Sequence, residues 1–266
     1  MHIGAMYIHP VKSLAAMARE AFFIDRFGPT WDRRWMVVDA RGRFITQRQC
    51  ATMALIQTAL DDDVLCLSHR DQETLRVSIA QCAHGEPVTV QVWDDECAAR
   101  LAPPVVHQWL SDVLGRSCRL VYMPDSTHRP VDPDYAPGGA TVSFADGFPL
   151  LLTTQASLAD LNGEMSQSVA MQRFRPNLVV EDAAPWGEDH WRVIQVGAMV
   201  FDVVKPCSRC AIPTIDPATG EKQPEVFRVL QQYRRRGNQV FFGQNLVPRG
   251  TGTLRLGDRV RVLESA

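Results

Sequence analysis

The chain lacks several features that would place it at once in a broad class of proteins. Its longest apolar runs, such as residues 148–152, are far too short to span a bilayer. The formal net charge is −2, so there is no basic excess of the kind that marks nucleic-acid-binding proteins. The first residues show no basic stretch followed by an apolar one, as a signal peptide would. We therefore expect a cytoplasmic protein that binds neither nucleic acid nor a membrane.

Cysteine is present, but not in the pattern of a disulfide framework. Five of the seven cysteines stand singly along the chain: Cys50, Cys66, Cys82, Cys97 and Cys118. They offer no second pair at the spacing of a structural zinc site. The C-x4-C-x2-C pattern of a plant-type iron–sulfur cluster is also missing. We expect reduced thiols and no iron–sulfur cluster in this chain.

The other two cysteines, Cys207 and Cys210, form the most informative segment of the sequence. Arg209 stands between them, and a permanent positive charge favours the thiolate, which binds soft metals or attacks electrophiles. A thioredoxin-type pair would open a helix, but Pro213 follows too closely. A local disulfide is disfavoured in a reducing compartment. A metal-bound thiolate on a loop after a strand at 199–204 is the sharpest interpretation.

Short strand-like runs, rich in β-branched and aromatic residues, dominate the chain. We expect strands at residues 3–8, 21–24, 35–39, 64–67, 75–79, 88–93, 119–123, 177–180, 192–196, 240–246 and 259–263. Capping residues and apolar periodicity predict helices at residues 104–115, 154–161 and 225–236. This pattern predicts a mainly β fold, with barrel-like sheets and a few helices.

A stretch rich in proline and glycine, residues 124–140, interrupts the strands. Such a composition is typical of a long loop or an interdomain linker. We therefore expect two domains, residues 1–123 and residues 124–266.

Cations at the ends of strands suggest anion binding. Lys12 and Ser13 follow the first strand, and an ammonium beside a hydroxyl suits a phosphate. The adjacent Arg33 and Arg34 enter a strand, where neighbouring side chains point to opposite faces. One arginine would then bind an anion while the other meets solvent. The competing interpretation is that both form salt bridges, with Asp32 and Asp39.

Taken in order along nearly the whole chain, these segments resemble the MOSC-domain family, which is named for the C-terminal domain of molybdenum cofactor sulfurase. The closer resemblance is to two-part members that begin with a β-barrel module, the mitochondrial amidoxime-reducing component and its bacterial counterparts among them. The matching segments are His9-Pro10-Val11-Lys12-Ser13, Asp32-Arg33-Arg34-Trp35, Thr46-Gln47-Arg48-Gln49, Ser143-Phe144-Ala145-Asp146, residues 156–162, Phe174-Arg175-Pro176-Asn177, Cys207-Ser208-Arg209-Cys210, Asp216-Pro217, Phe242-Gly243-Gln244 and Leu256-Gly257-Asp258. The resemblance implies an N-terminal MOSC-type β-barrel module followed by a MOSC domain.

The resemblance also implies a molybdenum–molybdopterin cofactor. It gives Cys210 the role of metal ligand and catalytic residue, with Cys207 as a neighbour. The phosphate of the pterin would be held by Lys12, Ser13 and Arg33.

The remaining cofactor contacts implied by the resemblance come from two later segments. Arg175 and Asn177 match an Arg-Pro-Asn motif that touches the pterin. Ser208 and Arg209 flank the metal ligand and would contact the cofactor too. This chain has Pro213 where many members carry threonine, which removes an N–H and a hydroxyl and leaves the substrate preference open.

The activity implied by the resemblance is the reduction of small N-hydroxylated substrates, namely amidoximes, hydroxylamines and N-hydroxylated bases. Because this chain has no iron–sulfur pattern, electrons would come from a separate flavoprotein, ferredoxin or cytochrome-type donor. The alternative is a cofactor carrier or sulfur-transfer domain without reductase activity. A third interpretation, a structural module with a degenerate site, is disfavoured because the cofactor-binding residues are intact.

Overall fold

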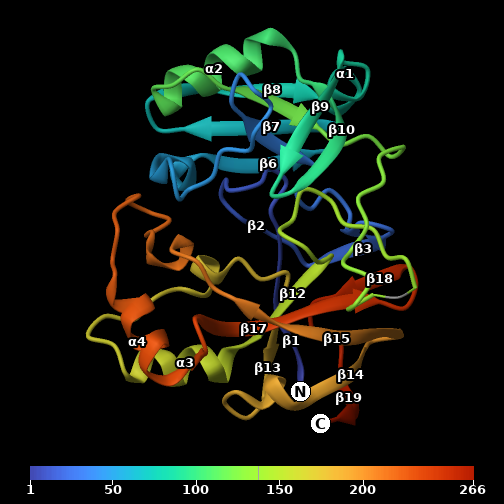
Figure 1. Cartoon of the computed structure of the whole chain (residues 1–266), viewed down its shortest axis with the longest axis vertical. Coiled ribbons are helices and arrows are strands. Elements are labelled where there is room, and N and C mark those ends of the chain that lie inside the picture. Colours follow the sequence, from blue (N-terminus) through green and yellow to red (C-terminus); the bar gives the residue numbers. More distant parts are fainter. Residues whose placement is uncertain (137) are drawn as a thin grey trace.

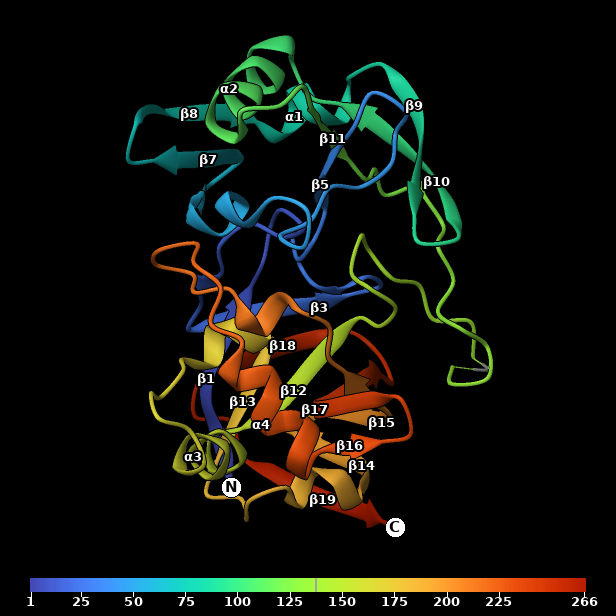
Figure 2. The same cartoon turned by 60° about the vertical axis from the view of Figure 1, so that its left-hand side comes forward.

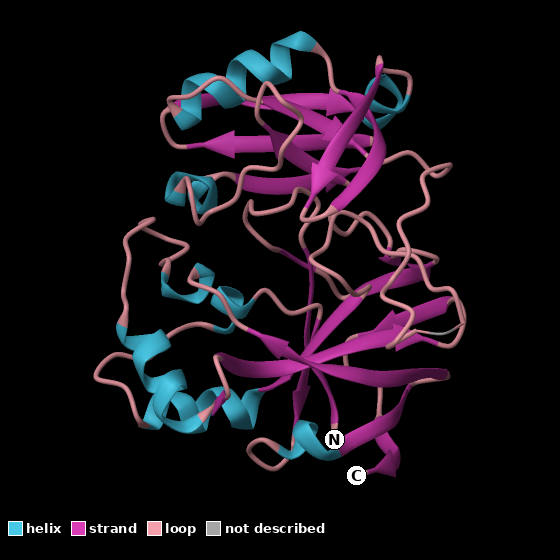
Figure 3. Cartoon of the chain, viewed as in Figure 1, coloured by secondary structure: helices cyan, strands magenta, loops and turns pink. Residues whose placement is uncertain are grey.

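The structure, a computed structural model, describes residues 1–136 and 138–266, and it is mainly β with a few helices, as predicted. Two β-rich lobes stack along the long axis of the molecule, and both termini lie at the free end of the lower one (Figure 1). Strands and loops make up most of each lobe, while helices cover the periphery (Figure 3).

The lower lobe is built on a nine-stranded sheet in the order β19-β14-β15-β17-β12-β13-β1-β2, with β16 beside β17. Its strands are β1 (His2–Ile8), β2 (Met17–Ala18), β12 (Leu150–Thr154), β13 (Leu178–Glu181), β14 (Trp191–Val196), β15 (Met199–Ser208), β16 (Arg235–Arg236), β17 (Gln239–Pro248) and β19 (Val260–Ser265). A small sheet beside it joins β18 (Gly252–Arg255), β3 (Ala21–Asp25) and β4 (Gly28–Pro29). The strand β12 runs parallel to β13, and the other pairs are antiparallel.

The upper lobe contains two smaller sheets (Figure 2). One has the order β5-β11-β10-β9, with β5 (Trp35–Val38), β9 (Pro87–Val92), β10 (Asp95–Leu101) and β11 (Arg119–Tyr122). The other joins β6 (Gln57–Asp61), β7 (Val64–His69) and β8 (Gln72–Ser78). Helices α1 (Ile79–Ala83) and α2 (Pro104–Leu114) pack on this lobe, and a 3-10 turn, η1, covers Ala51–Leu55.

The three predicted helices are present, with small changes at their ends. Helix α2 stops at Gly115, whose left-handed φ of 62° suits glycine. Helix α3 (Gln155–Gly163) is capped by Thr154, whose side chain accepts a hydrogen bond from the backbone N–H of Ser157. Helix α4 (Glu225–Tyr233) ends before the predicted residue 236 because Arg235–Arg236 instead pair with β17.

Two large hydrophobic cores hold the lobes. Trp35 is fully buried in the upper core, and Ile3 is fully buried in the lower one. The first strand of the chain therefore belongs to the lower sheet, where β1 pairs with β13. The described residues between β11 and β12 form neither helix nor strand. The predicted division between residues 123 and 124 stays a prediction.

One prediction about the cysteine segment needs correction. Strand β15 does not end near residue 204 but continues to Ser208, which pairs with Phe241 of β17. Cys207 therefore lies in the last part of a strand, and Cys210 follows in the loop. After it comes a single 3-10 turn, η4 (Ile212–Thr214), rather than a helix.

The other 3-10 turns, η2 (Met171–Phe174) and η3 (Gly187–His190), flank strand β13. In the described part of the chain, every helix is too short or too polar to cross a bilayer.

Candidate functional site

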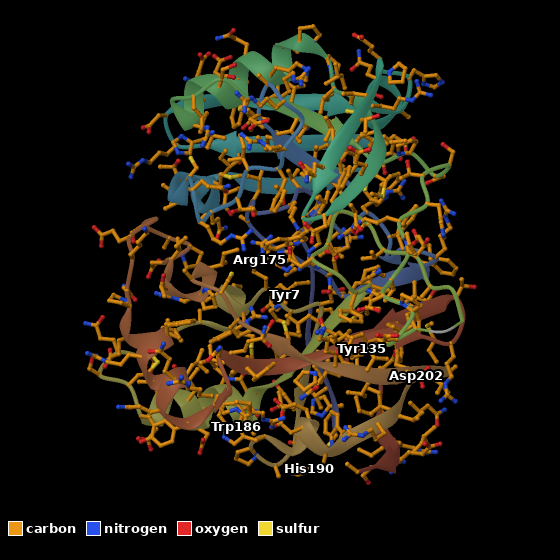
Figure 4. The ribbon with its side chains drawn as sticks, in the orientation of Figure 1. Tyr7, Tyr135, Arg175, Trp186, His190 and Asp202 are labelled. Atoms are coloured by element: carbon orange, nitrogen blue, oxygen red, sulfur yellow. The ribbon has the colours of Figure 1, made fainter. Side chains whose placement is uncertain are left out.

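An open pocket lies where the two lobes meet. It is lined by every residue that the sequence predicts for a cofactor site: Lys12, Ser13, Arg33, Arg175, Asn177, Ser208, Arg209 and Cys210. Cys207 lines it as well. We call it the first pocket. Segments far apart in the sequence thus converge at the junction between the lobes, where Figure 4 shows Arg175.

Three of these residues adopt a backbone conformation that is uncommon outside glycine. The φ angles are 67° for Ser13, 50° for Arg33 and 56° for Arg175. Left-handed non-glycine residues are a few per cent of all residues and concentrate at functional sites. Each of the three side chains leaves a sharp turn of the backbone, and the three turns meet at the pocket.

The ammonium of Lys12 is almost completely buried. Its Nζ donates to the backbone O of Phe144 at 2.7 Å and to Oδ1 of Asp146 at 2.5 Å. Burial lowers the pKa of Lys12, and the Asp146 carboxylate opposes that shift. The carboxylate is 67% exposed, whereas the lysine side chain is 6% exposed. Asp146 therefore covers the cation at the mouth of the pocket.

The guanidinium of Arg33 is fixed by neighbours on three sides. It pairs with the buried Asp32, donates to Oδ1 of Asn177 at 3.1 Å, and donates to the backbone O of Arg175 at 3.0 Å. The Asn177 amide is also anchored by the chain itself, because its Nδ2 donates to Tyr7 O and its Oδ1 also accepts from Leu151 N. Asn177 therefore orients Arg33, and its contact with the cofactor stays a prediction.

The hydrogen-bond donors of Arg175 are only partly satisfied. Its Nη1 donates to Leu14 O at 2.7 Å, but its buried Nη2 has no partner. Burial and the nearby Arg33 lower the pKa of Arg175 to about 9. Behind it lies the buried His9, and burial together with Arg33 and Arg175 holds the pKa of His9 well below its ordinary value. His9 is therefore neutral at pH 7 and adds no charge here.

The positive charge between the two cysteines contacts the first of them. Arg209 Nη1 donates to Cys207 Sγ at 2.9 Å, and its Nη2 donates to Phe174 O at 2.6 Å. The buried Nε has no partner. Cys210 lines the pocket as a free, half-buried thiol. The charge that the sequence placed beside a thiolate thus lies against Cys207, while Cys210 remains open to a ligand.

The adjacent arginines Arg33 and Arg34 agree only in part with each interpretation, that one binds an anion while the other meets solvent, or that both form salt bridges. Arg33 faces the first pocket, but Arg34 does not meet solvent: it is 3% exposed. Its Nη2 donates to Met123 O at 2.6 Å and pairs with Asp125 at 2.7 Å. Asp39 pairs with a different arginine. The reason is that the guanidinium of Arg34 lies between the rings of Phe27 and Tyr122, which cover it from water.

Sequence reasoning missed two charged residues of the pocket, Arg48 and Asp146. Both belong to segments that carried the family resemblance, which was the available signal. The guanidinium of Arg48 lies 4.5 Å from the ring centre of Trp93, and Trp93 Nε1 donates to Asp146 at 3.3 Å. Desolvation raises the pKa of Asp146, but the charges of Lys12, Arg48 and Arg33 outweigh it and hold that pKa well below its ordinary value.

Pro213 and Thr214, where the family pattern changes, are buried in the 3-10 turn and do not line the first pocket. The Thr214 hydroxyl donates to Ala211 O at 2.6 Å, within its own turn. Ile212 is the residue of this turn that does reach the pocket. Proline at position 213 therefore alters the buried turn next to the pocket rather than the residues that line the pocket.

The charges of the first pocket suit an anion. Asp146 balances Lys12, and Asp32 balances Arg33. In the described residues, no carboxylate lies within 4.0 Å of the guanidinium of Arg48, Arg175 or Arg209. Unpaired buried N–H groups are rare and point to a missing partner.

The same part of the chain contains no cluster of three or more His, Cys, Asp or Glu residues able to hold a metal. A metal at Cys210 would therefore take its other ligands from a bound cofactor. These residues fit a cofactor that carries both phosphate and a thiolate-ligated metal.

Comparison with known proteins gives the family. The profile of the MOSC N-terminal beta barrel domain matches residues 1–117, and that of the MOSC domain matches residues 139–261. The chain is 30% identical to mitochondrial amidoxime-reducing component 1 of Mus musculus, over 98% of this chain and 82% of that protein. Identity to the Homo sapiens protein of the same name is also 30%, with the same coverage. The molybdenum cofactor sulfurase of Oryza sativa subsp. japonica is 27% identical, over 91% of this chain but only 32% of that protein. The chain therefore belongs to the MOSC-domain family and combines a MOSC N-terminal beta barrel domain with a MOSC domain.

Proposed function

We propose that the chain binds a molybdenum–molybdopterin cofactor and reduces small N-hydroxylated compounds. The observation that supports this most strongly is the first pocket, where the free thiol of Cys210 lies among the charges of Lys12, Arg33, Arg175 and Arg209. A thiol suited to a soft metal and a cationic wall suited to a phosphate occur together. Similarity to proteins named amidoxime-reducing component supports the choice of substrate class.

In this proposal, the phosphate binds beside Lys12, Ser13 and Arg33. Arg33 is held rigidly by Asp32 and Asn177, so little side-chain freedom is lost when it binds an anion. The carboxylate of Asp146 must share Lys12 with the phosphate or move away from it.

The other end of the cofactor lies, in this proposal, against Arg175, Ser208 and Arg209. Arg175 contributes its positive charge, and Arg209 contributes an unpaired Nε–H that an acceptor atom of a pterin would satisfy. Ser208 is exposed at the end of β15, so its hydroxyl is free to contact a ligand.

Cys210 would ligate the metal. When bound, the cofactor supplies the two-electron chemistry that cleaves an N–O bond, a reaction that consumes two protons and releases water. Cys207 is engaged with Arg209 and would hold that arginine in place. Electrons would arrive from a separate flavoprotein, ferredoxin or cytochrome-type protein.

The first test measures molybdenum by elemental analysis and released pterin by fluorescence, on protein from cells that synthesise the cofactor. Cys210→Ala should lose benzamidoxime reduction with a chemical reductant, whereas Cys207→Ala should retain most of it. Cys50→Ala, a half-buried thiol outside the pocket, is the matched control. Full turnover by Cys210→Ala would overturn the proposal.

A second candidate function is that of a cofactor carrier or sulfur-transfer domain. Similarity to molybdenum cofactor sulfurases over 91% of the chain supports this second candidate. A carrier would pass its cofactor to a cofactor-free enzyme and would not turn over benzamidoxime. Turnover without such transfer would exclude this candidate.

A further inference from the structure

A second cleft lies between the lobes and shares Arg175 and Ile212 with the first pocket. One wall comes from the segment after β1, with Ala15 and Ala16. The opposite wall comes from the loop that follows Cys210, with Ile215. The cleft and the first pocket differ in the rest of their described lining: Cys207 and Cys210 line the first pocket, and no cysteine lines the cleft.

Arg173, at the base of this cleft, is only 6% exposed. Its Nη2 donates to Asp216 at 2.6 Å and to Gln223 at 2.7 Å. Its Nη1 is buried and has no partner among the described residues. Because buried donors are nearly always satisfied, this N–H points to an acceptor that binds in the cleft.

Arg175 brings a second unpartnered group, its Nη2, to the same cleft. Asp216 balances the charge of Arg173, but no carboxylate pairs with Arg175 in the part of the chain that the structure describes. The side chains that line the cleft include three glutamines and no acid. The cleft therefore carries one uncompensated positive charge, which matches a monoanion better than a dianion.

The remaining lining is apolar and small. Ala15, Ala16, Ala54 and Ile215 offer methyl groups, so the cleft accepts an apolar body as well as a charge. We propose that the second cleft binds a small organic carboxylate, whose oxygens accept from the free N–H groups of Arg173 and Arg175 while its apolar part packs on the alanines. This site goes beyond the proposed function and needs neither Cys210 nor a bound metal.

Three compounds of nearly equal shape test the charge requirement: benzoate, benzamide and benzamidine. Calorimetric titration of the full chain should give an affinity in that order, with benzoate at least tenfold tighter than neutral benzamide and no measurable binding of cationic benzamidine. Equal affinities, or tighter binding of benzamidine, would overturn the proposal.

Variants then locate the bound benzoate. Ala16→Leu fills the cleft, Ala218→Trp blocks its exposed rim, and Arg173→Lys keeps a cation beside Asp216 but removes the unpaired N–H. Each should weaken benzoate binding about tenfold. Arg48→Gln, which alters the first pocket only, should leave it unchanged.

Loss of benzoate binding in Arg48→Gln with retention in Ala16→Leu would place the carboxylate in the first pocket and overturn the proposal. Because Ala218 is exposed, Ala218→Trp should fold normally. If Ala16→Leu or Arg173→Lys is unstable, Ala218→Trp still tests whether benzoate binds in the cleft.

Discussion

Two groups of arginines in this molecule, one buried and one half-buried, differ in how their N–H groups are satisfied. Arg34 and Arg129 are each 3% exposed, and both have hydrogen-bond partners and a carboxylate. Arg129 donates to Asp95, to Ser143 O and to Ala145 O. Arg175 and Arg209, at the first pocket, each have a buried N–H without a partner and no carboxylate within reach in the described residues.

The difference separates cations that support the fold from cations arranged for a ligand. A buried hydrogen bond to a charged group contributes about 1.5–3 kcal/mol, and a buried donor without a partner costs about 1–3 kcal/mol. The satisfied arginines therefore stabilise the chain by itself. The unsatisfied ones lower its stability until an anion binds, so the two groups should respond to mutation in opposite ways.

The largest effect is expected at Arg129. Arg129→Gln leaves two buried carbonyls of the loop 143–146 without donors, and we expect a loss of about 3 kcal/mol in the free energy of unfolding. Urea denaturation measures it, with Arg70→Gln as control, because that side chain is 81% exposed. A loss below about 1 kcal/mol would show that Arg129 is not a structural cation.

Arg175→Gln should show the converse. We expect a change of less than about 1 kcal/mol in the free energy of unfolding, since one hydrogen bond, to Leu14 O, is lost but a buried N–H without a partner is removed. Pyrophosphate binding to the cofactor-free chain should weaken about tenfold. If this variant were as destabilised as Arg129→Gln, the distinction between the two groups would fail.

His9 sharpens the comparison through pH. Its pKa in the folded chain is well below its ordinary value of 6.5, so below pH 6.5 the unfolded chain binds a proton that the folded chain does not. Stability should therefore fall on acidification, by up to about 1.4 kcal/mol per pH unit from this residue.

Denaturation of the parent chain and His9→Asn at pH 7.0 and 5.5 tests this effect. The variant should lose about 1 kcal/mol less than the parent over that interval. Parallel losses in both proteins would mean that His9 becomes protonated in the folded state.

The smallest effect is expected at Asp146. Because its carboxylate is largely exposed, Asp146→Asn should change stability by less than about 1 kcal/mol. The same variant frees Lys12 from its carboxylate, so pyrophosphate should bind about threefold more tightly. Unchanged or weaker binding would show that the carboxylate holds Lys12 in its binding position instead of competing with the anion.

Much of the fold could be predicted from local patterns, because strand and helix signals act over a few residues. Helix α2 shows this, since Pro104 at its start and Gly115 after its end mark it in the sequence. Strand β15 shows the limit. Its last residues, including Pro206 and Cys207, are not typical of a strand, and pairing with β17 extends the strand through them.

The candidate site divides in the same way. The sequence named eight residues of the first pocket through motifs and family resemblance, because each motif is a short local pattern. It did not identify Asp146 as the partner of Lys12, since 134 positions separate them. Nor did it show that Asn177 orients Arg33, or that Arg34 is buried.

The sequence by itself determined the mainly β character, the capped helices and the supply of thiol and cations, because these depend on residue type and short-range order. Only the tertiary structure decided which charges are neutralised. Whether Arg129 or Arg175 has a partner depends on carbonyls and carboxylates brought close by the packing of the two lobes. These long-range contacts, rather than the number of charged residues, determine whether an arginine supports the fold or remains free for a ligand.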